Sequence, residues 1–309
     1  MNIIETTGLG KRYRRNWALR DCTLGIPGGH VVALVGPNGA GKTTMLSMAV
    51  GLTTPTAGRV TVLGGERAGS SGALDGIAFV AQDAPLYKNL PAGDMLHLTR
   101  NLNRRWDQHR AETRLAELGI PLTKKVGKLS GGQQAQLALT VALARRPDLL
   151  VLDEPLAMLD PLARHDFMAS VMAAVADDGV SVVLSSHVLA ELERVASYLI
   201  VLSHGQIQVA GEVDDLLAGH QVLTGPAVET DQQAQRMRVV QSRRDGAQSQ
   251  LLVKTTTAAD PVPPGWAAQD VSLEELVLAY LREGVSAPPG PAAVQAGHET
   301  ASHGKGVHQ

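Results

Sequence analysis

The sequence predicts a layered α/β domain over residues 1–219. Short β-branched runs alternate with longer helical patterns over this region, which is typical of a sheet covered by helices. Near-continuous apolar runs at Val31–Val35, Leu149–Asp153 and Val180–Ser186 indicate strands that are buried on both faces. The first of these runs leads directly into a glycine-rich turn that opens a helix.

The remaining elements of this domain follow from apolar periodicity and from the turn residues at their ends. Strands are expected at Ile77–Ala81 and on either side of a His204-Gly205 turn within Tyr198–Gly211. The helices are expected at Lys42–Gly51, Ala92–Asn103, Gln108–Leu118, Gly131–Arg145, Pro161–Asp178 and Leu189–Ala196.

After Gly219 the composition changes, which predicts a small α+β domain at 220–284 and a disordered tail at 285–309. A capping box at Ser272 and Glu275 predicts a helix at Ser272–Glu283. The expected strands are Gln221–Thr224, ended by Gly225-Pro226, then Met237–Ser242 and Gln248–Thr255, joined by an Asp245-Gly246 hairpin turn.

Composition excludes several classes of protein. With 44% hydrophobic residues among 309, the chain can bury a sizeable core. A net charge of −2 argues against a protein that coats nucleic acid, so no nucleic-acid partner is expected. The single cysteine, Cys22, rules out an internal disulfide and suits a reducing cytoplasm. No apolar run approaches the roughly 20 residues that span a bilayer, so any membrane role is expected to come through a separate chain.

The glycine-rich turn is a phosphate-binding motif. Gly36-Pro37-Asn38-Gly39-Ala40-Gly41-Lys42-Thr43 fits the P-loop pattern, between a buried strand and a helix. Its backbone N–H groups and the helix N-terminus favour an anion. Lys42 is expected to reach the β- and γ-phosphates of ATP, and the Thr43 hydroxyl to ligate Mg²⁺. The predicted ATP contacts are Gly36, Asn38, Gly39, Ala40, Gly41, Lys42, Thr43 and Thr44.

Two carboxylates end a second buried strand. Because such a strand exposes side chains only at its end, Asp153 and Glu154 are expected in a cleft. We expect Asp153 to belong to the Mg²⁺ shell. Glu154 is expected to point to the opposite face, toward an attacking water.

A second glycine-rich helix start changes the class of protein. Ser130-Gly131-Gly132-Gln133 precedes an apolar-periodic helix with Ser130 as N-cap, so it is a second anion-binding helix end. One nucleotide cannot readily use two such ends of one chain. Two chains in twofold, head-to-tail pairing can, each presenting Ser130 and Gly132 to the other's γ-phosphate.

With these motifs in this order, residues 2–219 resemble the nucleotide-binding subunit of an ATP-binding cassette (ABC) transporter. The resemblance implies an antiparallel β subdomain and a helical subdomain beside the main sheet. It implies that Tyr13 stacks on adenine, with Trp17 as a rival, and that Gln82 touches Mg²⁺ and the attacking water. It also implies that Asp160 links the two opposed sites, and that His187 holds the γ-phosphate and orients the water of Glu154. The catalytic set is thus Glu154, His187 and Gln82. The partner's contacts are Ser130, Gly131, Gly132, Gln133 and Asp160.

The resemblance extends to partners and location. Leu86-Tyr87-Lys88-Asn89-Leu90 is similar to the bacterial drug or antibiotic exporters whose membrane subunits are separate chains. It implies an ATPase that dimerises with itself or a paralogue and drives export from the inner face of the cell membrane, with Pro85, Leu86 and Tyr87 gripping the permease. The alternative is a non-transport ABC ATPase acting on a soluble partner. A P-loop kinase or GTPase is disfavoured, because no guanine-reading Asn-Lys-x-Asp motif is present.

Overall fold

Six strands form the central sheet of the computed structural model, which describes residues 1–82, 86–255 and 262–282. Their spatial order is β10-β9-β3-β8-β7-β6, and only the β9–β10 pair is antiparallel. The strands are β3 (Val31–Val35), β6 (Ile77–Val80), β7 (Leu149–Asp153), β8 (Ser181–Ser186), β9 (Tyr198–Ser203) and β10 (Gln206–Glu212). Because β3, β8 and β7 are parallel neighbours, their carboxyl ends open at one edge of the sheet.

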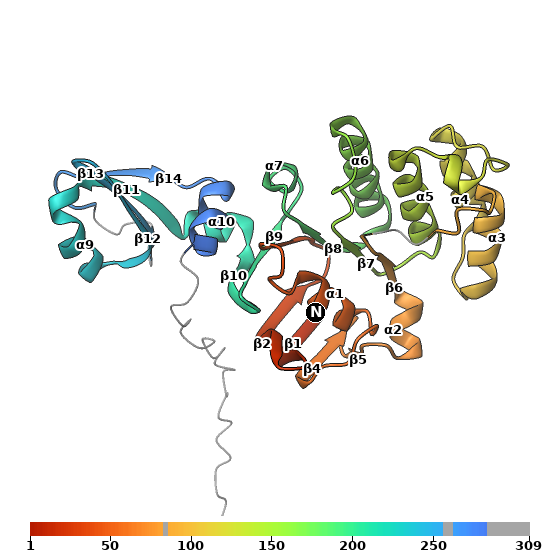
Figure 1. Cartoon of the computed structure of the whole chain (residues 1–309), viewed down its shortest axis with the longest axis horizontal. Coiled ribbons are helices and arrows are strands. Elements are labelled where there is room, and N and C mark those ends of the chain that lie inside the picture. The colour runs from red at the N-terminus through yellow and green to blue at the C-terminus, as the bar shows by residue number, and fades with distance from the viewer. Residues whose placement is uncertain (83–85, 256–261, 283–309) are drawn as a thin grey trace, which may run out of the picture.

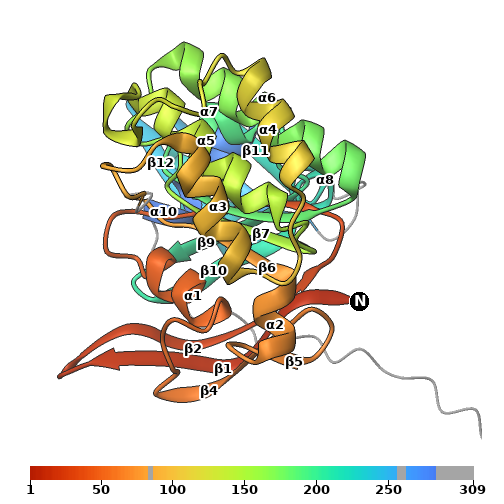
Figure 2. The same cartoon turned by 90° about the vertical axis from the view of Figure 1, so that its right-hand side faces the viewer.

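A second, antiparallel sheet packs on one face of the first (Figure 2). Its order is β2-β1-β4-β5, and α1 lies between the two sheets. Leu9, Ile26 and Leu46 belong to one buried cluster with Val32 and Val183 of the central sheet. The elements are β1 (Asn2–Tyr13), β2 (Asn16–Pro27), α1 (Lys42–Ala49), β4 (Ala57–Val62), β5 (Glu66–Arg67) and α2 (Ser71–Gly76).

Helices cover the other face of the central sheet and extend beyond it as a helical subdomain (Figures 1 and 2). Phe167 and Val171 of α6 pack into the same cluster as Leu152 and Leu184. The helical subdomain has a separate buried cluster, which includes Leu96, Leu115 and Leu137. The helices are α3 (Ala92–Leu102), α4 (Gln108–Glu117), the 3₁₀ turn Val126–Lys128, α5 (Gly131–Ala144), α6 (Pro161–Asp178), α7 (Leu189–Leu192) and α8 (Val213–Ala218).

Residues 220–282, here called the C-terminal unit, form a third sheet at the opposite end of the molecule from the helical subdomain (Figure 1). Its order is β12-β13-β11-β14. The last helix packs back onto the main domain, because Leu276 and Val277 share a cluster with Leu199 and Val201. The elements are β11 (His220–Pro226), the 3₁₀ turn Ala227–Glu229, α9 (Thr230–Arg236), β12 (Arg238–Asp245), β13 (Gln248–Lys254), β14 (Ala267–Asp270) and α10 (Leu273–Arg282).

The α/β class and most predicted elements are confirmed, and three details are wrong. The helix expected at Leu189–Ala196 ends at Leu192, after a single turn. The strand expected to stop at Thr224 continues through Gly225-Pro226, because Pro226 still pairs with Gln248 at the strand end. The hairpin after β12 is present, but Asp245 pairs with Gln248, so the turn is centred on Gly246, whose φ is 60°.

The capping box at Ser272 is confirmed, with its hydroxyl accepting from the Glu275 N–H at 3.2 Å. Pro85, the end of the predicted last helix at Glu283 and the predicted tail at 285–309 lie outside the described residues. Among the helices described, none combines the length and apolar character needed to cross a bilayer.

Candidate nucleotide site

The loop after β3 adopts a backbone shape that requires glycine at two positions. Gly39 and Gly41 have φ of 81° and 108°, which side-chain-bearing residues rarely adopt. A Cβ on Gly41 would stand 2.6 Å from the carbonyl oxygen of Ala18, so the close approach of β2 also requires glycine here. The loop therefore lies against the antiparallel sheet in a fixed shape and delivers Lys42 as the first residue of α1.

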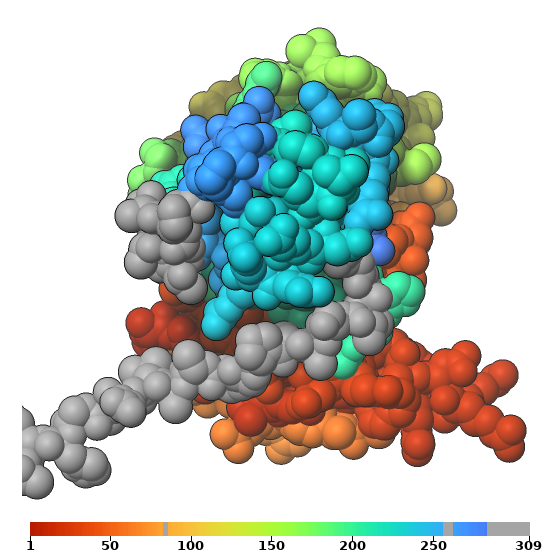
Figure 3. Space-filling view, turned by 90° about the vertical axis from the view of Figure 1, so that its left-hand side faces the viewer, coloured from red at the N-terminus to blue at the C-terminus, as the bar shows by residue number. Residues whose placement is uncertain are grey.

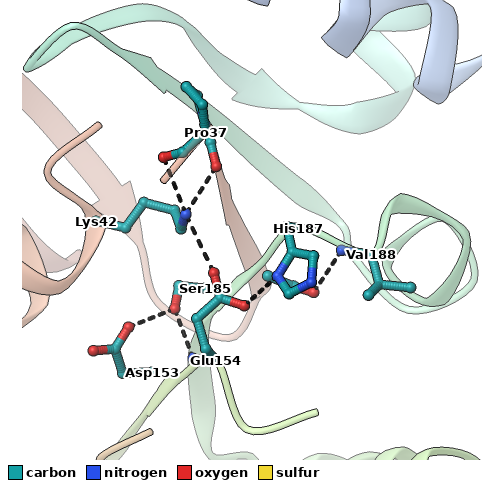
Figure 4. Close-up of polar contacts among 9 residues, drawn as sticks. Pro37, Lys42, Asp153, Glu154, Ser185, His187 and Val188 are labelled. Carbon is teal, nitrogen blue, oxygen red and sulfur yellow. Dashed lines mark hydrogen bonds and ion pairs between the residues drawn. The ribbon is translucent and has the colours of Figure 1, made fainter. Parts of the chain in front are cut away.

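Lys42 is nearly buried, with 6% of its side chain exposed. Its Nζ donates to the carbonyl oxygen of Gly36 at 2.8 Å and lies 3.2 Å from Oε1 of Glu154 (Figure 4). Both contacts point the ammonium into the space in front of the loop. A charge held this far from water interacts strongly with an anion.

Glu154 follows β7 and bridges two groups. Its Oε1 faces Lys42, and its Oε2 lies 2.7 Å from Nδ1 of His187, which follows β8 (Figure 4). The backbone of Glu154 has φ 47°, a left-handed conformation that turns the chain at the strand end. The parallel order β3-β8-β7 is what brings the loop lysine, His187 and Glu154 to one edge.

Asp153 lies behind these groups, with 2% exposed. Ser185 of β8 donates to Oδ1 of Asp153 at 2.7 Å, and the same hydroxyl accepts the N–H of Glu154 at 2.8 Å. Ser185 thus holds the two carboxylate residues in their separate orientations. The sequence reasoning missed Ser185. Its one signal is its position directly after the apolar residues 182–184, where β8 ends in two serines.

Lys42, Glu154 and His187 line a cavity of about 500 Å³. Of the residues predicted to contact ATP, the cavity brings together Tyr13, Asn38, Gly39, Ala40, Gly41, Lys42, Thr43, Thr44, Gln82, Glu154 and His187. Ala18, Pro37 and Ala157 complete its lining. Of the predicted site residues on this side, Gly36 and Asp153 do not line it. Trp17 lines a separate hollow with Arg20 and His204, so Tyr13 is the aromatic at the nucleotide cavity.

The second glycine-rich helix start lies outside this cavity. Ser130 and Gln133 form a reciprocal capping box: the Ser130 hydroxyl accepts from Gln133 N–H at 3.2 Å, and Gln133 Oε1 accepts from Ser130 N–H at 3.3 Å. Asp160 caps α6 by accepting from Ala163 N–H at 2.9 Å. Beside it, Met158 and Leu162 are 86% and 70% exposed. The cavity of the same chain is not lined by any of the residues predicted to reach a partner's nucleotide, which are Ser130, Gly131, Gly132, Gln133 and Asp160.

The oxygen donors near the cavity suit a hard divalent cation. Thr43 offers a hydroxyl, Gln82 an amide oxygen and Asp153 a carboxylate, whereas no group of three or more His, Cys, Asp or Glu is gathered among the described residues. Mg²⁺ typically takes one or two protein oxygens together with substrate phosphates and water. The donor set therefore fits Mg²⁺ carried in with a nucleotide.

Comparisons with known proteins agree with this geometry. A family model described as ABC transporter matches residues 19–157. The chain is 36% identical over 228 residues to the Fe(3+) ions import ATP-binding protein FbpC of Mesorhizobium japonicum, covering 70% of this chain and 62% of that relative. It is 30% identical over 223 residues to the lantibiotic transport ATP-binding protein SrtF of Streptococcus pyogenes, covering 69% and 92%. The chain thus spans less than two thirds of the length of the import protein.

Solved structures give the same picture. An ATP-binding subunit of an ABC transporter superposes with a TM-score of 0.62 at 28% identity, covering 69% of this chain and 91% of the other. A dimeric ATP-binding cassette in a post-hydrolysis state bound to ADP and Pi superposes with a TM-score of 0.60 at 26% identity, covering 68% and 98%.

Proposed function

This chain belongs to the ATP-binding subunits of ABC transporters, and from that premise we propose that it binds ATP in the cavity around Lys42 and hydrolyses it to drive export. The observation that carries the proposal is the meeting of Lys42, Glu154 and His187 in front of a glycine-shaped anion loop. A cation that can neutralise phosphate charge, together with a carboxylate and an imidazole that can position a water, suits phosphoryl transfer to water.

Binding begins with the phosphates of ATP. The loop N–H groups and the start of α1 receive them, while Lys42 exchanges its contact with Glu154 for the γ-phosphate. Tyr13 at the cavity rim offers a flat surface for the adenine. Thr43, Gln82 and Asp153 would hold Mg²⁺, which would neutralise phosphate charge.

Hydrolysis follows once Glu154 is released from its contact with Lys42. Its carboxylate, kept in place by His187, accepts a proton from a water whose oxygen attacks the γ-phosphorus. The bond from the γ-phosphorus to the bridging oxygen breaks, and ADP leaves with the electron pair. Ser185 keeps the backbone of Glu154 fixed through this step.

The open side of the cavity is closed by a second subunit, either a copy of this chain or a paralogue. Ser130 to Gln133 and Asp160 do not line the cavity of their own chain and are available to a partner's nucleotide. Exposed Met158 and Leu162 lie beside them as apolar contact surface. ATP joins two such subunits and hydrolysis separates them, which supplies a cycle of motion.

Separate permease subunits transmit the joining and separation of the ATP-binding subunits to the membrane. Tyr87 is 62% exposed on the helical subdomain, and Leu86 beside it packs into two core clusters. We assign this surface to the permease, which places the chain at the cytoplasmic face of the membrane. Export is favoured over import by the resemblance of residues 86–90 to exporter subunits. Of the two relatives described above, one is named for Fe(3+) import and the other for lantibiotic transport.

Co-purification tests the transporter assignment. The chain is tagged in its native host, membranes are dissolved in mild detergent, and the proteins that accompany it are identified with and without ATP. A polytopic membrane protein in fixed ratio to the tagged chain is the expected result. Recovery from the soluble fraction alone would favour the alternative, an ABC-type ATPase that acts on a soluble partner.

A further inference from the structure

The C-terminal unit contains a cavity that the ATPase site does not use. At about 630 Å³ it exceeds the nucleotide cavity and lies within the range of small-molecule sites. It is bounded by β11, β13, the end of α9, the start of β12 and the turn before β14. The lining residues are Gln221, Leu223, Gln233, Arg236, Met237, Arg238, Val253, Lys254, Thr255, Val262, Pro263 and Pro264. Figure 3 looks onto the C-terminal unit from the end remote from the helical subdomain.

One part of the lining is apolar and fixed in place. Leu223 and Val253 are 3% and 4% exposed, and they pack with Leu251 and Trp266 in the core of the unit. Met237 packs against the same cluster. Side chains locked in a core form a wall before any ligand arrives, which lowers the entropy cost of binding an apolar body.

The lining also holds a buried amide. Gln233 is 7% exposed and belongs to the lining. An amide that lines a cavity can donate a hydrogen bond to a polar group of a ligand and accept one from it. Gln221 offers a second amide from β11.

The charged residues in the described part of the lining are all basic. Arg236, Arg238 and Lys254 belong to the lining, and among the described residues no acidic side chain does. Arg238 and Lys254 are direct partners across β12 and β13, where like charges repel. Within the described part of the chain, no ion pair joins any of the three to a carboxylate, whereas Arg244 on the same strand is paired with Asp231. An anion in the cavity would relieve this repulsion.

We propose that this cavity binds a small organic anion with an apolar body. The apolar body lies against Leu223 and Val253, its negative group lies at the basic edge formed by Arg236, Arg238 and Lys254, and Gln233 hydrogen-bonds to its polar portion. The site is separate from ATP hydrolysis and gives the C-terminal unit a ligand of its own.

The test uses the full chain and a pair of probes, with ADP and Mg²⁺ added to occupy the nucleotide site. The anionic probe is 8-anilinonaphthalene-1-sulfonate, and its neutral counterpart is N-phenyl-1-naphthylamine. Saturable binding of the anion at one site per chain, tighter than that of the neutral probe, is expected. Arg236→Gln with Lys254→Gln should weaken anion binding about fivefold or more and leave the neutral probe unchanged. The control is Arg243→Gln, an exposed arginine of β12 outside the cavity.

A steric variant provides a second, independent measurement. Val262 is 42% exposed at the cavity, so Val262→Trp should fill the space and abolish binding of both probes without disturbing the core. Val228→Trp, at a residue that is 92% exposed in the same unit and outside the cavity, should leave binding unchanged. The proposal is overturned if the neutral probe binds as tightly as the anion, or if neither the charge variant nor Val262→Trp alters anion binding.

Discussion

Oε1 of Glu154 lies 3.2 Å from Nζ of Lys42, while Oε2 of the same carboxylate lies 2.7 Å from Nδ1 of His187. One carboxylate therefore contacts both the cation that would bind the γ-phosphate and the imidazole that would orient the water. An incoming phosphate competes with Glu154 for Lys42. The competition couples nucleotide binding to release of the proposed base.

Glu154→Gln separates these two roles. The amide has nearly the same shape but no charge, so it gives up Lys42 readily and cannot accept the proton of water. We expect ATP affinity equal to or tighter than that of the parent chain, and hydrolysis slower by about 10²- to 10⁴-fold. Equilibrium binding and single-turnover hydrolysis measure the two quantities. The variant should also accumulate as an ATP-bound dimer in size-exclusion chromatography. Turnover near the parent rate would remove Glu154 from the role of base.

Ser185→Ala tests how the carboxylates are held apart. The hydroxyl is fully buried, donates to Asp153 and accepts from Glu154 N–H, so its loss leaves a buried donor and acceptor unpaired. We expect a loss of about 1–3 kcal/mol in the free energy of unfolding. The Mg²⁺ concentration for half-maximal ATPase activity should also rise, because Asp153 loses its orientation. Ser186→Ala, at the next residue of the strand, is the control. Equal Mg²⁺ dependence in both variants would argue against a role for Ser185 in orienting Asp153.

The sequence could predict the loop, the two carboxylates and His187 because each lies at the end of a short apolar strand whose pattern is local. The ion pair of Lys42 with Glu154 and the two bonds of Ser185 could not be predicted, since they depend on the spatial order β3-β8-β7. The strands β1 and β2 were not placed from the sequence either. Their pairing has repeated register shifts between Asn2 and Arg12, so apolar residues do not alternate cleanly. The resemblance, and not the periodicity, supplied the antiparallel subdomain.

His220 makes the stability of the C-terminal unit depend on pH. It is 2% exposed at the junction with the main domain, with Nδ1 donating to the Leu216 carbonyl at 2.6 Å and Nε2 accepting from the Tyr280 hydroxyl at 2.8 Å. Desolvation lowers the pKa of His220, with a further lowering from Lys254. Burial also raises the pKa of Tyr280 to about 12, so its hydroxyl remains a donor.

The direction of this pH dependence follows from proton uptake by the unfolded chain. Because the folded pKa of His220 is below the unfolded value of about 6.5, the unfolded chain binds more protons in the interval between the two. The contribution of neutral His220 is therefore complete above about pH 6.5 and is lost as the pH falls toward the folded pKa. Urea unfolding between about pH 5 and pH 8 should show stability rising with pH. His220→Gln should flatten this slope, whereas Tyr280→Phe should keep it, since the imidazole stays buried. An unchanged slope in His220→Gln would place the pH dependence elsewhere.

Tyr87→Glu tests the surface assigned to the permease. Tyr87 is 62% exposed, so a carboxylate there should not disturb folding, whereas Leu86 packs into the core and would confuse the result. Burying an unpaired charge against an apolar permease helix is costly. Transport by the assembled complex should therefore fall on the order of tenfold, while ATPase activity of the isolated subunit remains at the parent level. The matched control is Leu102→Glu, at the end of α3 on the same subdomain, where the leucine is 75% exposed. Full transport with Tyr87→Glu, or an equal loss with Leu102→Glu, would show that this surface does not contact the permease.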